Sequence, residues 1–355
     1  MDSIQTNNCT IHFNDIIYPA LNKHINENNF SKIFILVDEN THEFCLPFFL
    51  KQLETEIVIE IIEIESGEIN KTIDTCVGVW NTLSELDADR KSLLINIGGG
   101  VITDLGGFVA CTFKRGIAYV NVPTTLLSMV DASVGGKTGV DLGHLKNQIG
   151  VISNPDLVLI DTQFLATLPQ NQMRSGLAEM LKHGLISSEA YWNKFQNLSE
   201  LNTNDLDQLI HESVLIKKNV VEIDPFENGL RKTLNFGHTL GHAIETYFLS
   251  TSEKTTLLHG EAIVIGMILA AYISTELTGF PKETTLKIKE FFTEYYGKID
   301  ISEDERQPIM DLMKYDKKNN HGNINFVLLE DIGKPKIDCL VDDNIIIDAF
   351  NFYAS

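Results

Sequence analysis

Two histidines stand four residues apart, His238 and His242, in the segment LRKTLNFGHTLGHAIE at residues 230–245. On a helix this spacing puts both imidazoles on one face, where they can bind zinc. Arg231 and Asn235 extend the same row at near-helical spacing. A buried helix carries Leu or Ile along such a row, so this row either faces water or lines a site. The segment is poor in Lys and Glu, which argues against a solvated face.

Two other segments supply further metal-ligand chemistry. His259 opens HGEAIVIG at an expected helix start, and Glu179 lies in GLAEMLKHG beside Lys182 and His183. A catalytic zinc site takes three protein ligands and leaves one position for water or substrate, so two histidines and one glutamate from three helices suffice. A single histidine is more often an ordinary core or surface residue, and that is the expectation for His183, His211 and His321.

A glycine turn in LLINIGGGVITDLGGFVA (93–110) follows an apolar run and precedes a helical pattern. Glycines there let a backbone approach a pyrophosphate, and the helix N-terminus adds N–H groups and a positive dipole end. The G-x-G-x-x-G pattern is incomplete, because Thr103 stands at the third glycine position after Gly98 and Gly100. The acidic residue expected later is missing, and the candidate, Asp38, comes earlier. We therefore expect a variant nucleotide site, with a purely structural turn as the alternative.

A second glycine cluster, DASVGGKTGVD (131–141), contains the letters GGKT. A phosphate-binding P-loop requires glycine at the position that Asp131 occupies, so an ATPase is rejected. Lys137 and Thr138 remain suitable ligands for an anion in a glycine turn.

Composition and charge narrow the class of protein. A chain of 355 residues predicts two domains, and 43% hydrophobic with 22% charged residues is typical of a soluble protein. A net charge of -21 disfavours nucleic acid as a partner, whereas an anionic small substrate needs only a local group of cations. Five scattered cysteines without a CxxC pair fit a reducing compartment. No signal pattern opens the chain, and the longest apolar run, 262–273, is shorter than the ~20 residues of a membrane span. We expect a cytoplasmic protein that does not bind membranes.

The elements that must position these residues follow from the apolar pattern. Strands are predicted at 32–40, 56–65, 92–100, 117–123 and 157–161, and helical patterns between several of them imply a largely parallel sheet covered on both faces. Beyond about Leu168 the pattern is helical at 173–186, 205–222, 230–248, 260–277 and 283–296, with one late hairpin or short strand at 323–332. The predicted fold is α/β plus all-α: a Rossmann-like parallel-sheet domain (1–168) followed by a helical metal- and substrate-binding domain (169–355). A ligand site is expected in the cleft between them.

Taken together, the segments resemble 3-dehydroquinate synthase of the sugar-phosphate cyclase superfamily. The resemblance runs from about Asp38 to YDKKNNHGNINFVLLEDIGK and rests on GGGVITDLGGFVACTFKRG, VPTTLLSMVDASVGGKTGVD, KNQIG, AEMLKHG, GLRKTLNFGHTLGHAIE and HGEAIVIGM. It implies an NAD-binding Rossmann-like domain, a helical domain and a homodimer.

The resemblance also implies roles for individual residues. It implies zinc or cobalt held by Glu179, His238 and His259, with His242 serving substrate and proton transfer instead of the metal. The implied catalytic residues are Glu227, His242, Lys182 and Asp131. The implied NAD contacts are Asp38, Glu68, Lys71, Gly99, Gly100, Val101, Asp104, Thr124, Thr125, Lys146 and Thr167. The implied substrate contacts are Asp131, Lys137, Asn147, Lys182, Lys217, Arg231, Asn235, His242, a lysine of DKK (Lys317 or Lys318), and Arg115 reaching into the partner subunit's site. Ser175 stands where some relatives have Asn.

The implied reaction converts 3-deoxy-D-arabino-heptulosonate 7-phosphate to 3-dehydroquinate and phosphate, in the shikimate pathway of aromatic amino acid biosynthesis. Hydride passes from C5 to NAD, phosphate is eliminated, hydride returns, the ring opens and an intramolecular aldol closes the carbocycle. Arg231 and Lys217 suit the substrate carboxylate. The alternatives are another cyclase, such as 2-deoxy-scyllo-inosose synthase or an epi-valiolone synthase, a metal-dependent polyol dehydrogenase, and a non-catalytic nucleotide-binding protein.

Overall fold

A computed structural model describes the chain except for residues 8, 144, 197–201, 252–253 and 314–323. The chain forms two compact units. The first comprises Met1–Met173 and Asn204–Lys218, and the second comprises Arg174–Thr203 and Asn219–Ser355. The chain therefore enters each unit twice.

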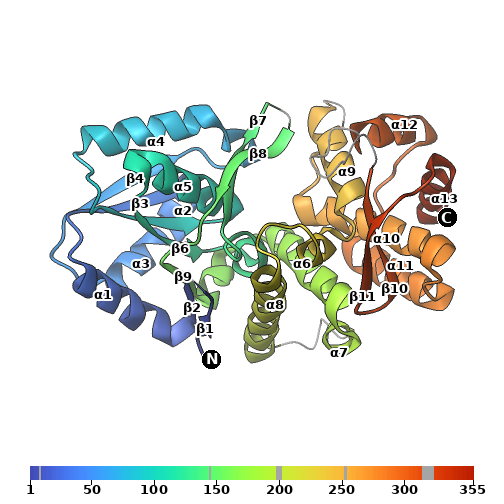
Figure 1. Ribbon diagram of the computed structural model, residues 1–355, viewed down its shortest axis with the longest axis horizontal. Helices are drawn as coiled ribbons and strands as arrows, with labels where there is room; N and C mark the ends of the chain where they lie inside the picture. The colour runs from blue at the N-terminus through green and yellow to red at the C-terminus, as the bar shows by residue number, and fades with distance from the viewer. Residues whose placement is uncertain (8, 144, 197–201, 252–253, 314–323) are drawn as a thin grey trace. The chain divides into compact units, whose positions relative to one another are not determined.

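A seven-stranded sheet forms the centre of the first unit, with the strand order β1-β2-β9-β6-β5-β3-β4 (Figure 1). All neighbours are parallel except β1, which runs antiparallel to β2. The apolar runs of β3, β5 and β9 are buried along almost their whole length, as expected where both faces of a parallel sheet are covered. The five predicted strands are confirmed, whereas β1 and β2 were not predicted. The strands are β1 (Ile4–Gln5), β2 (Thr10–Phe13), β3 (Ile33–Asp38), β4 (Ile59–Ile64), β5 (Leu93–Gly98), β6 (Ala118–Pro123) and β9 (Leu157–Ile160).

Helices cover both faces of this sheet, with α4 and α5 on one side and α1 and α3 on the other (Figure 1). One apolar core joins α4 and α5 to β3 and β5: Cys76, Val79 and Leu105 pack with Phe34 and Leu94. The helices are α1 (Ile17–Asn28), α2 (Glu39–Phe44), α3 (Leu46–Gln52), α4 (Ile73–Glu85) and α5 (Gly100–Thr112), with short turns η1 (Asn14–Ile16), η2 (Glu68–Asn70), η3 (Phe113–Arg115), η4 (Ser128–Ala132) and η5 (Thr162–Thr167).

The strand order creates a switch point between β3 and β5. After β3 the chain continues to β4 on one side, then returns to β5 on the other side. In such sheets ligands bind at the carboxyl ends of the strands where the order reverses. Asp38 ends β3 and Gly98 ends β5, so the predicted NAD residues begin at this point.

An antiparallel hairpin, β7 (Lys137–Leu142) and β8 (Leu145–Ile152), also belongs to the first unit and was not predicted. It packs on α5, where Thr138 lies against Gly107. The helix α8 (Thr203–Ile223) supplies the remaining part of this unit with its residues up to Lys218.

The second unit is helical, as predicted. It contains α6 (Gln170–Ser187), α7 (Glu189–Asn193), α9 (His238–Ser250), α10 (His259–Thr278), α11 (Lys282–Tyr296), α12 (Glu303–Leu312) and α13 (Asp343–Ala354). The late β-rich segment is a hairpin of β10 (Phe326–Asp331) and β11 (Lys334–Cys339). Within the described residues α10 is the one helix long and apolar enough to cross a membrane, but 72% of its apolar window is buried inside the protein. This confirms the prediction of a buried core helix.

The helix predicted over 230–248 is interrupted. Leu230–Asn235 forms a 3-10 turn, η7, and α9 begins only at His238. The break falls at Gly237, whose φ of 78° lies in the left-handed region that favours glycine. Arg231 and Asn235 therefore do not continue the helical face of His238 and His242, and that part of the prediction was wrong.

Candidate active site

Glycines set the spacing of the helices that carry the predicted metal ligands. Glu179 lies on α6, His238 opens α9 and His259 opens α10. A Cβ at Gly266 would lie 2.0 Å from the Gly237 carbonyl oxygen, and one at Gly260 would lie 2.3 Å from the Ser175 carbonyl oxygen. Backbone therefore packs on backbone between α9 and α10 and between α6 and α10. The Ser175 hydroxyl also accepts the Gly260 N–H at 2.9 Å.

The three predicted ligands meet at one carboxylate oxygen. Oε1 of Glu179 lies 3.5 Å from Nε2 of His238 and 3.7 Å from Nε2 of His259. Ligand atoms about 2.0–2.1 Å from a tetrahedral zinc lie roughly 3.3 Å apart, so these separations fit a divalent ion with little adjustment. Two imidazoles and a carboxylate are also a donor set that zinc and cobalt accept. The residues present fit the implied metal.

His242 belongs to the same cluster. One nitrogen from each of His238, His242 and His259 lies within 4.8 Å of the others. The ring of His242 is centred 5.1 Å from that of His238 and 5.7 Å from that of His259. The i, i+4 pair is thus brought together as the spacing predicted, while the carboxylate of Glu179 contacts His238 and His259.

Two further charged groups contact the ligands. The buried Lys182 ammonium pairs with Oε2 of Glu179, the other oxygen of the carboxylate. Glu245 lies beside His259, with Oε2 3.1 Å from Nδ1. Burial opposes a charge on His259, but the carboxylates of Glu245 and Glu179 outweigh it and raise the pKa of its imidazole to about 10. Glu245 was missed from the sequence, although it follows His238 by seven residues and so lies on the same face of α9.

A loop before α9 holds the predicted acid–base residue. The Asp224 carboxylate accepts N–H groups of Asn228, Gly229 and Arg231 at 2.9, 2.7 and 3.0 Å. Within this loop Glu227 has a φ of 61°. Its Oε1 accepts the side-chain amide of Asn235 at 2.6 Å. Non-glycine residues in this left-handed region occur more often at functional sites than elsewhere.

Arg231 is 2% exposed, and Nη1 of its guanidinium donates to the Pro225 carbonyl at 2.7 Å. This bond ties one nitrogen of the guanidinium to the loop that precedes η7. Arg231, Asn235 and Glu227 are therefore brought together by the loop and by η7, through a route other than the predicted helix.

The glycine turn of the first unit has the predicted strand–turn–helix form. Gly99 caps α5, and a Cβ at Gly98 would lie 2.5 Å from Ile102. Thr103, at the missing third glycine, bonds back to the Gly99 carbonyl at 3.3 Å. Close packing of this helix on the sheet is provided three residues later, because a Cβ at Gly106 would lie 2.0 Å from the Asn96 amide. The variant fingerprint thus keeps the geometry that the standard one serves.

Asp38 is the last residue of β3 and also caps α2. Its Oδ1 accepts the Thr41 N–H at 2.8 Å, and the Thr41 hydroxyl bonds back to the Asp38 N–H at 3.0 Å. A capping box of this kind holds the carboxylate at the carboxyl end of β3, beside the switch point.

Lys71 links several predicted NAD and substrate residues. Its buried ammonium lies 2.6 Å from Oδ2 of Asp104 and 2.7 Å from Oδ1 of Asn147. Glu68 lies 3.8 Å from it and 3.0 Å from the ammonium of Lys146. Burial opposes the charge on Lys71, but Asp104 and Glu68 outweigh it and raise its pKa. The hairpin β7–β8 is thereby tied to α5 and η2.

Asp131 and Lys217 form an ion pair in the first unit, with Nζ 2.6 Å from Oδ1. The same ammonium also contacts the Asp131 carbonyl. Lys137 is exposed where GGKT runs into the strand β7. A P-loop lysine begins a helix, whereas Lys137 begins a strand, so the rejection of a P-loop at this segment is confirmed.

The remaining predicted residues lie as follows. Thr124 and Thr125 follow β6, and the Thr124 N–H donates to the Gly98 carbonyl at 3.0 Å. Val101 and Gly100 lie in the first turn of α5. Thr167 is exposed at the end of η5, and Arg115 is exposed with a φ of 70°. Lys317 and Lys318 lie outside the described residues.

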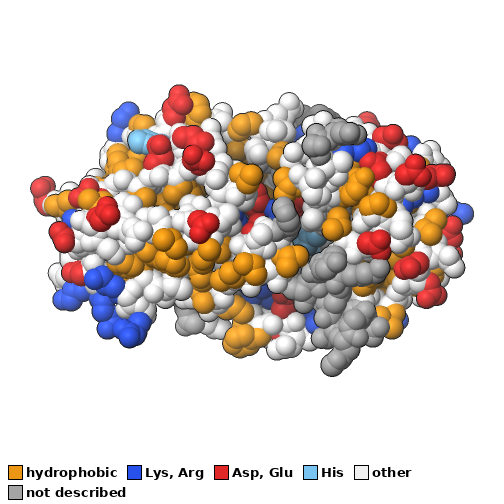
Figure 2. Space-filling model, turned by 90° about the horizontal axis from the view of Figure 1, so that it is seen from above, with side chains coloured by type: hydrophobic (Ala, Val, Ile, Leu, Met, Phe, Trp, Pro, Cys, Tyr) orange, Lys and Arg blue, Asp and Glu red, His pale blue; other side chains and the backbone are white. Residues whose placement is uncertain are grey.

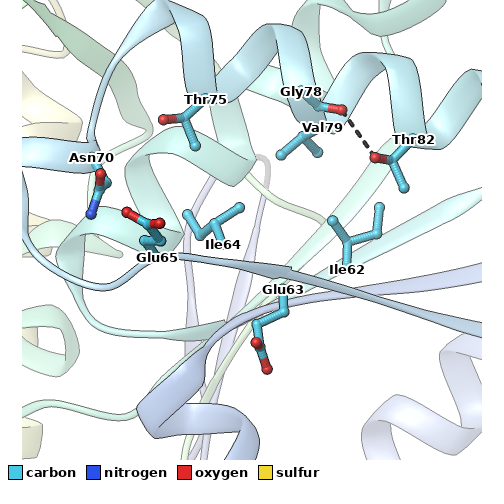
Figure 3. Close-up of a pocket in the computed structure, with 9 residues that line it drawn as sticks. All are labelled: Ile62, Glu63, Ile64, Glu65, Asn70, Thr75, Gly78, Val79 and Thr82. Atoms are coloured by element: carbon cyan, nitrogen blue, oxygen red, sulfur yellow. Dashed lines mark hydrogen bonds between the residues drawn. The ribbon is translucent and has the colours of Figure 1, made fainter.

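A shallow cavity of about 320 Å³ beside β4 and α4 is a separate feature (Figure 3). None of the predicted site residues lines it, so it does not contribute to the candidate site. Its lining is Ile62, Glu63, Ile64, Glu65, Asn70, Thr75, Gly78, Val79 and Thr82. On the face shown in Figure 2, acidic side chains are spread widely, so the negative charge forms no single acidic patch there.

Comparison with known proteins identifies the family. The family model for the 3-dehydroquinate synthase N-terminal domain matches residues 61–175, and that for the C-terminal domain matches residues 176–319. The 3-dehydroquinate synthase of Parabacteroides distasonis is 42% identical over 326 residues, covering 91% of this chain and 92% of the relative. A 2-deoxy-scyllo-inosose synthase, solved with carbaglucose-6-phosphate, NAD+ and Co2+, is 25% identical with a TM-score of 0.83, covering 97% of this chain and 96% of that one. A 2-epi-5-epi-valiolone synthase from Streptomyces hygroscopicus, solved with NAD+ and Zn2+, is 23% identical with a TM-score of 0.85, covering 100% and 99%.

Proposed function

The chain belongs to the 3-dehydroquinate synthase family, and from this premise we propose how its residues convert 3-deoxy-D-arabino-heptulosonate 7-phosphate to 3-dehydroquinate and phosphate. The observation that carries the proposal is the single Glu179 oxygen that faces Nε2 of both His238 and His259. The same unit holds a buried arginine and an acid–base residue bonded to an amide, which are groups that a polyanionic sugar acid requires.

NAD and a divalent ion, zinc or cobalt, are the cofactors. A solved cyclase of this fold holds NAD with Co2+, which supports the same pair here. Glu179, His238 and His259 would hold the ion. Gly99, Gly100 and Val101 would receive the pyrophosphate at the N-terminus of α5, with the NAD contacts completed by Asp38, Glu68, Lys71, Asp104, Thr124, Thr125, Lys146 and Thr167. When bound, NAD would supply reversible hydride transfer at C5, and the ion would supply polarisation of the C5 oxygen.

Different side chains bind the carboxylate and the phosphate of the anionic substrate. Arg231 offers a planar fork for the carboxylate, with Nη1 anchored on the Pro225 carbonyl, and Lys217 adds a point charge. Lys137, Asn147, Asn235 and His242 suit the phosphate. Lys182 and Asp131 complete the substrate contacts among the described residues, and the family resemblance alone assigns Lys317 or Lys318 to the phosphate.

Glu227 and His242 hold and move the protons of the substrate hydroxyls. Asn235 donates to Glu227 and so orients one carboxylate oxygen. His242 stands in the histidine cluster, with its ring centred 5.1 Å from that of His238 and 5.7 Å from that of His259. General acid–base catalysis by positioned groups of this kind contributes about 10²–10⁴-fold to a rate.

We place the enzyme in the cytoplasm as a homodimer. Arg115 is exposed in a left-handed turn after α5, which suits a side chain that serves the site of the partner subunit. A chain of net charge -21 uses such local cations to bind an anion against its own diffuse field.

The test is phosphate release from the heptulosonate phosphate by purified protein supplied with NAD and zinc or cobalt. The proposal expects one phosphate per turnover with no net NADH. Steady accumulation of NADH would instead indicate a polyol dehydrogenase. Turnover of glucose 6-phosphate in place of the heptulosonate would indicate an inosose synthase, whose substrate has no carboxylate for Arg231.

A further inference from the structure

We propose that Glu245 is a positioning residue for metal binding and fixes His259 in the tautomer and orientation of a ligand. The inference rests on the proposed metal site and deepens it. Glu245 and Glu179 contact opposite nitrogens of one imidazole: Oε2 of Glu245 lies 3.1 Å from Nδ1 of His259, and Oε1 of Glu179 lies 3.7 Å from Nε2. An imidazole whose Nδ1–H donates to a carboxylate presents the lone pair of Nε2 to a metal.

The other histidine ligand has the same arrangement with a neutral partner. Nδ1 of His238 lies 3.1 Å from the Phe236 carbonyl, and its Nε2 lies 3.5 Å from Oε1 of Glu179. Both rings therefore turn Nε2 toward the same carboxylate oxygen. A hydrogen bond to a charged acceptor is stronger than one to a carbonyl and makes the ligand nitrogen more basic. His259 is thus the more strongly supported of the two histidine ligands.

The position of His259 explains why it needs a charged partner. It is the first residue of α10, where the positive end of the helix dipole opposes a cation. Glu179, which faces it, shares its charge with the buried ammonium of Lys182. A second carboxylate at Glu245 restores negative charge around a divalent ion. It comes from α9, which also carries His238, so one helix supplies a ligand and also orients the ligand of its neighbour.

The experiment compares the zinc affinity of the full-length wild-type chain with that of its variants. Both are measured without substrate or NAD, by competition with a chromophoric chelator. Glu245→Gln keeps the shape and removes the charge, and we expect zinc affinity to fall about 10–100-fold, the usual effect of losing such a partner. Glu276→Gln on the exposed end of α10 is the matched control and should leave the affinity unchanged. Glu245→Asp, which keeps the charge, should recover part of the loss.

Two readouts separate positioning from a general structural role. The thermal midpoint of the metal-free Glu245→Gln protein should match that of wild type, and the visible absorption of the cobalt-loaded variant should differ from that of cobalt-loaded wild type. In a His259→Ala background, Glu245→Gln should add no further loss of affinity, because the residue it acts through is gone.

The outcomes distinguish this inference from the proposed function. If wild type and Glu245→Gln each bind one zinc with the same affinity, the role of Glu245 is overturned and the metal site stands. A lower thermal midpoint of the metal-free Glu245→Gln protein, together with a lower zinc affinity, would assign Glu245 a structural role instead. Wild type that binds no zinc, or a His238→Ala variant that binds it as wild type does, would overturn the metal site itself and the proposed function with it.

Discussion

The side-chain amide of Asn235 lies 2.6 Å from Oε1 of Glu227, eight residues earlier in the chain. One residue is the last of η7 and the other lies in a loop held by Asp224, so their meeting depends on this loop and on the turn that follows it. The bond orients a carboxylate whose own backbone is in the left-handed region.

Removal of the Glu227 carboxylate should affect catalysis more than binding. We expect Glu227→Gln to lower kcat about 10²–10⁴-fold with little change in KM. The substitution removes a carboxylate that transfers protons, but it keeps the shape of the side chain. Phosphate release under saturating substrate measures the effect. Glu222→Gln on α8 serves as the control, and a loss confined to KM would contradict the assigned role.

Loss of the metal should abolish activity and be reversible. We expect dialysis against a chelator to stop phosphate release and added zinc or cobalt to restore it, because the His238 and His259 nitrogens converge on Glu179. His259→Ala should need far more metal for the same restoration. Unchanged turnover in the thoroughly chelated protein would exclude the proposed metal role.

Glycine-to-alanine substitutions in two helices should have opposite signs. Gly266→Ala places a methyl 2.0 Å from the Gly237 carbonyl oxygen and should cost about 1–3 kcal/mol or more of unfolding free energy. Gly78→Ala in α4 meets nothing within 4 Å and should stabilise by about 0.5–1 kcal/mol. Urea midpoints measure both. Equal effects would show that α9 and α10 are not packed backbone to backbone.

The buried ammonium of Lys71 should matter for stability through its carboxylate partners. Lys71→Met leaves Asp104 without this cation and should cost about 3–5 kcal/mol, and Asp104→Asn in the same chain should recover part of it. Carboxylates raise the folded-state pKa of Lys71. Its contribution is therefore fully present below the unfolded value of about 10.4 and is lost as the pH rises through the folded value. Urea unfolding at several pH values measures the difference in unfolding free energy between wild type and Lys71→Met. This difference should shrink only in strong alkali.

The Asp224 carboxylate gives a prediction at the acid end. Burial opposes its charge, but three backbone N–H groups outweigh the burial and lower its pKa. Its contribution is thus present above the unfolded value of about 3.9 and is lost as the pH falls through the folded value. Asp224→Asn should be less stable than wild type at pH 7, and the difference should shrink as the pH falls below the unfolded value. A difference that persists in acid would mean that the charge is not what holds the loop.

The parallel sheet could be predicted because β3, β5, β6 and β9 are buried on both faces and appear as unbroken apolar runs. The hairpin β7–β8 could not be predicted, because the segment KTGVDL (137–142) contains a glycine and the exposed Leu142, and β8 ends in the exposed Ile152. These residues show no alternation that marks a buried face. Similarly, the periodicity at 230–248 continues through Gly237, and only the backbone shows that a left-handed residue divides it.

The candidate site could be predicted from the sequence only in part. The i, i+4 spacing of His238 and His242 correctly predicted that their rings lie together, because both residues lie within α9. The contacts of Glu179 with His259, and of His259 with Glu245, join separate helices, and no local spacing encodes them. The residues came from a family resemblance, whereas their partners, such as Asn235 for Glu227 and Lys71 for Asn147, came only from the structure.

The direct contact of Gly266 with the Gly237 carbonyl bears on which ions this protein can select. Side chains change rotamer at small cost, but two main chains in contact cannot move closer, so the spacing between the first residues of α9 and α10 is close to its lower limit. The two helices therefore cannot approach further to tighten the site around a smaller ion, and only rotation of the imidazoles can shorten the bonds. The lower limit on the size of the site would thus be set by the main chains of the unit, well away from the atoms that touch the ion.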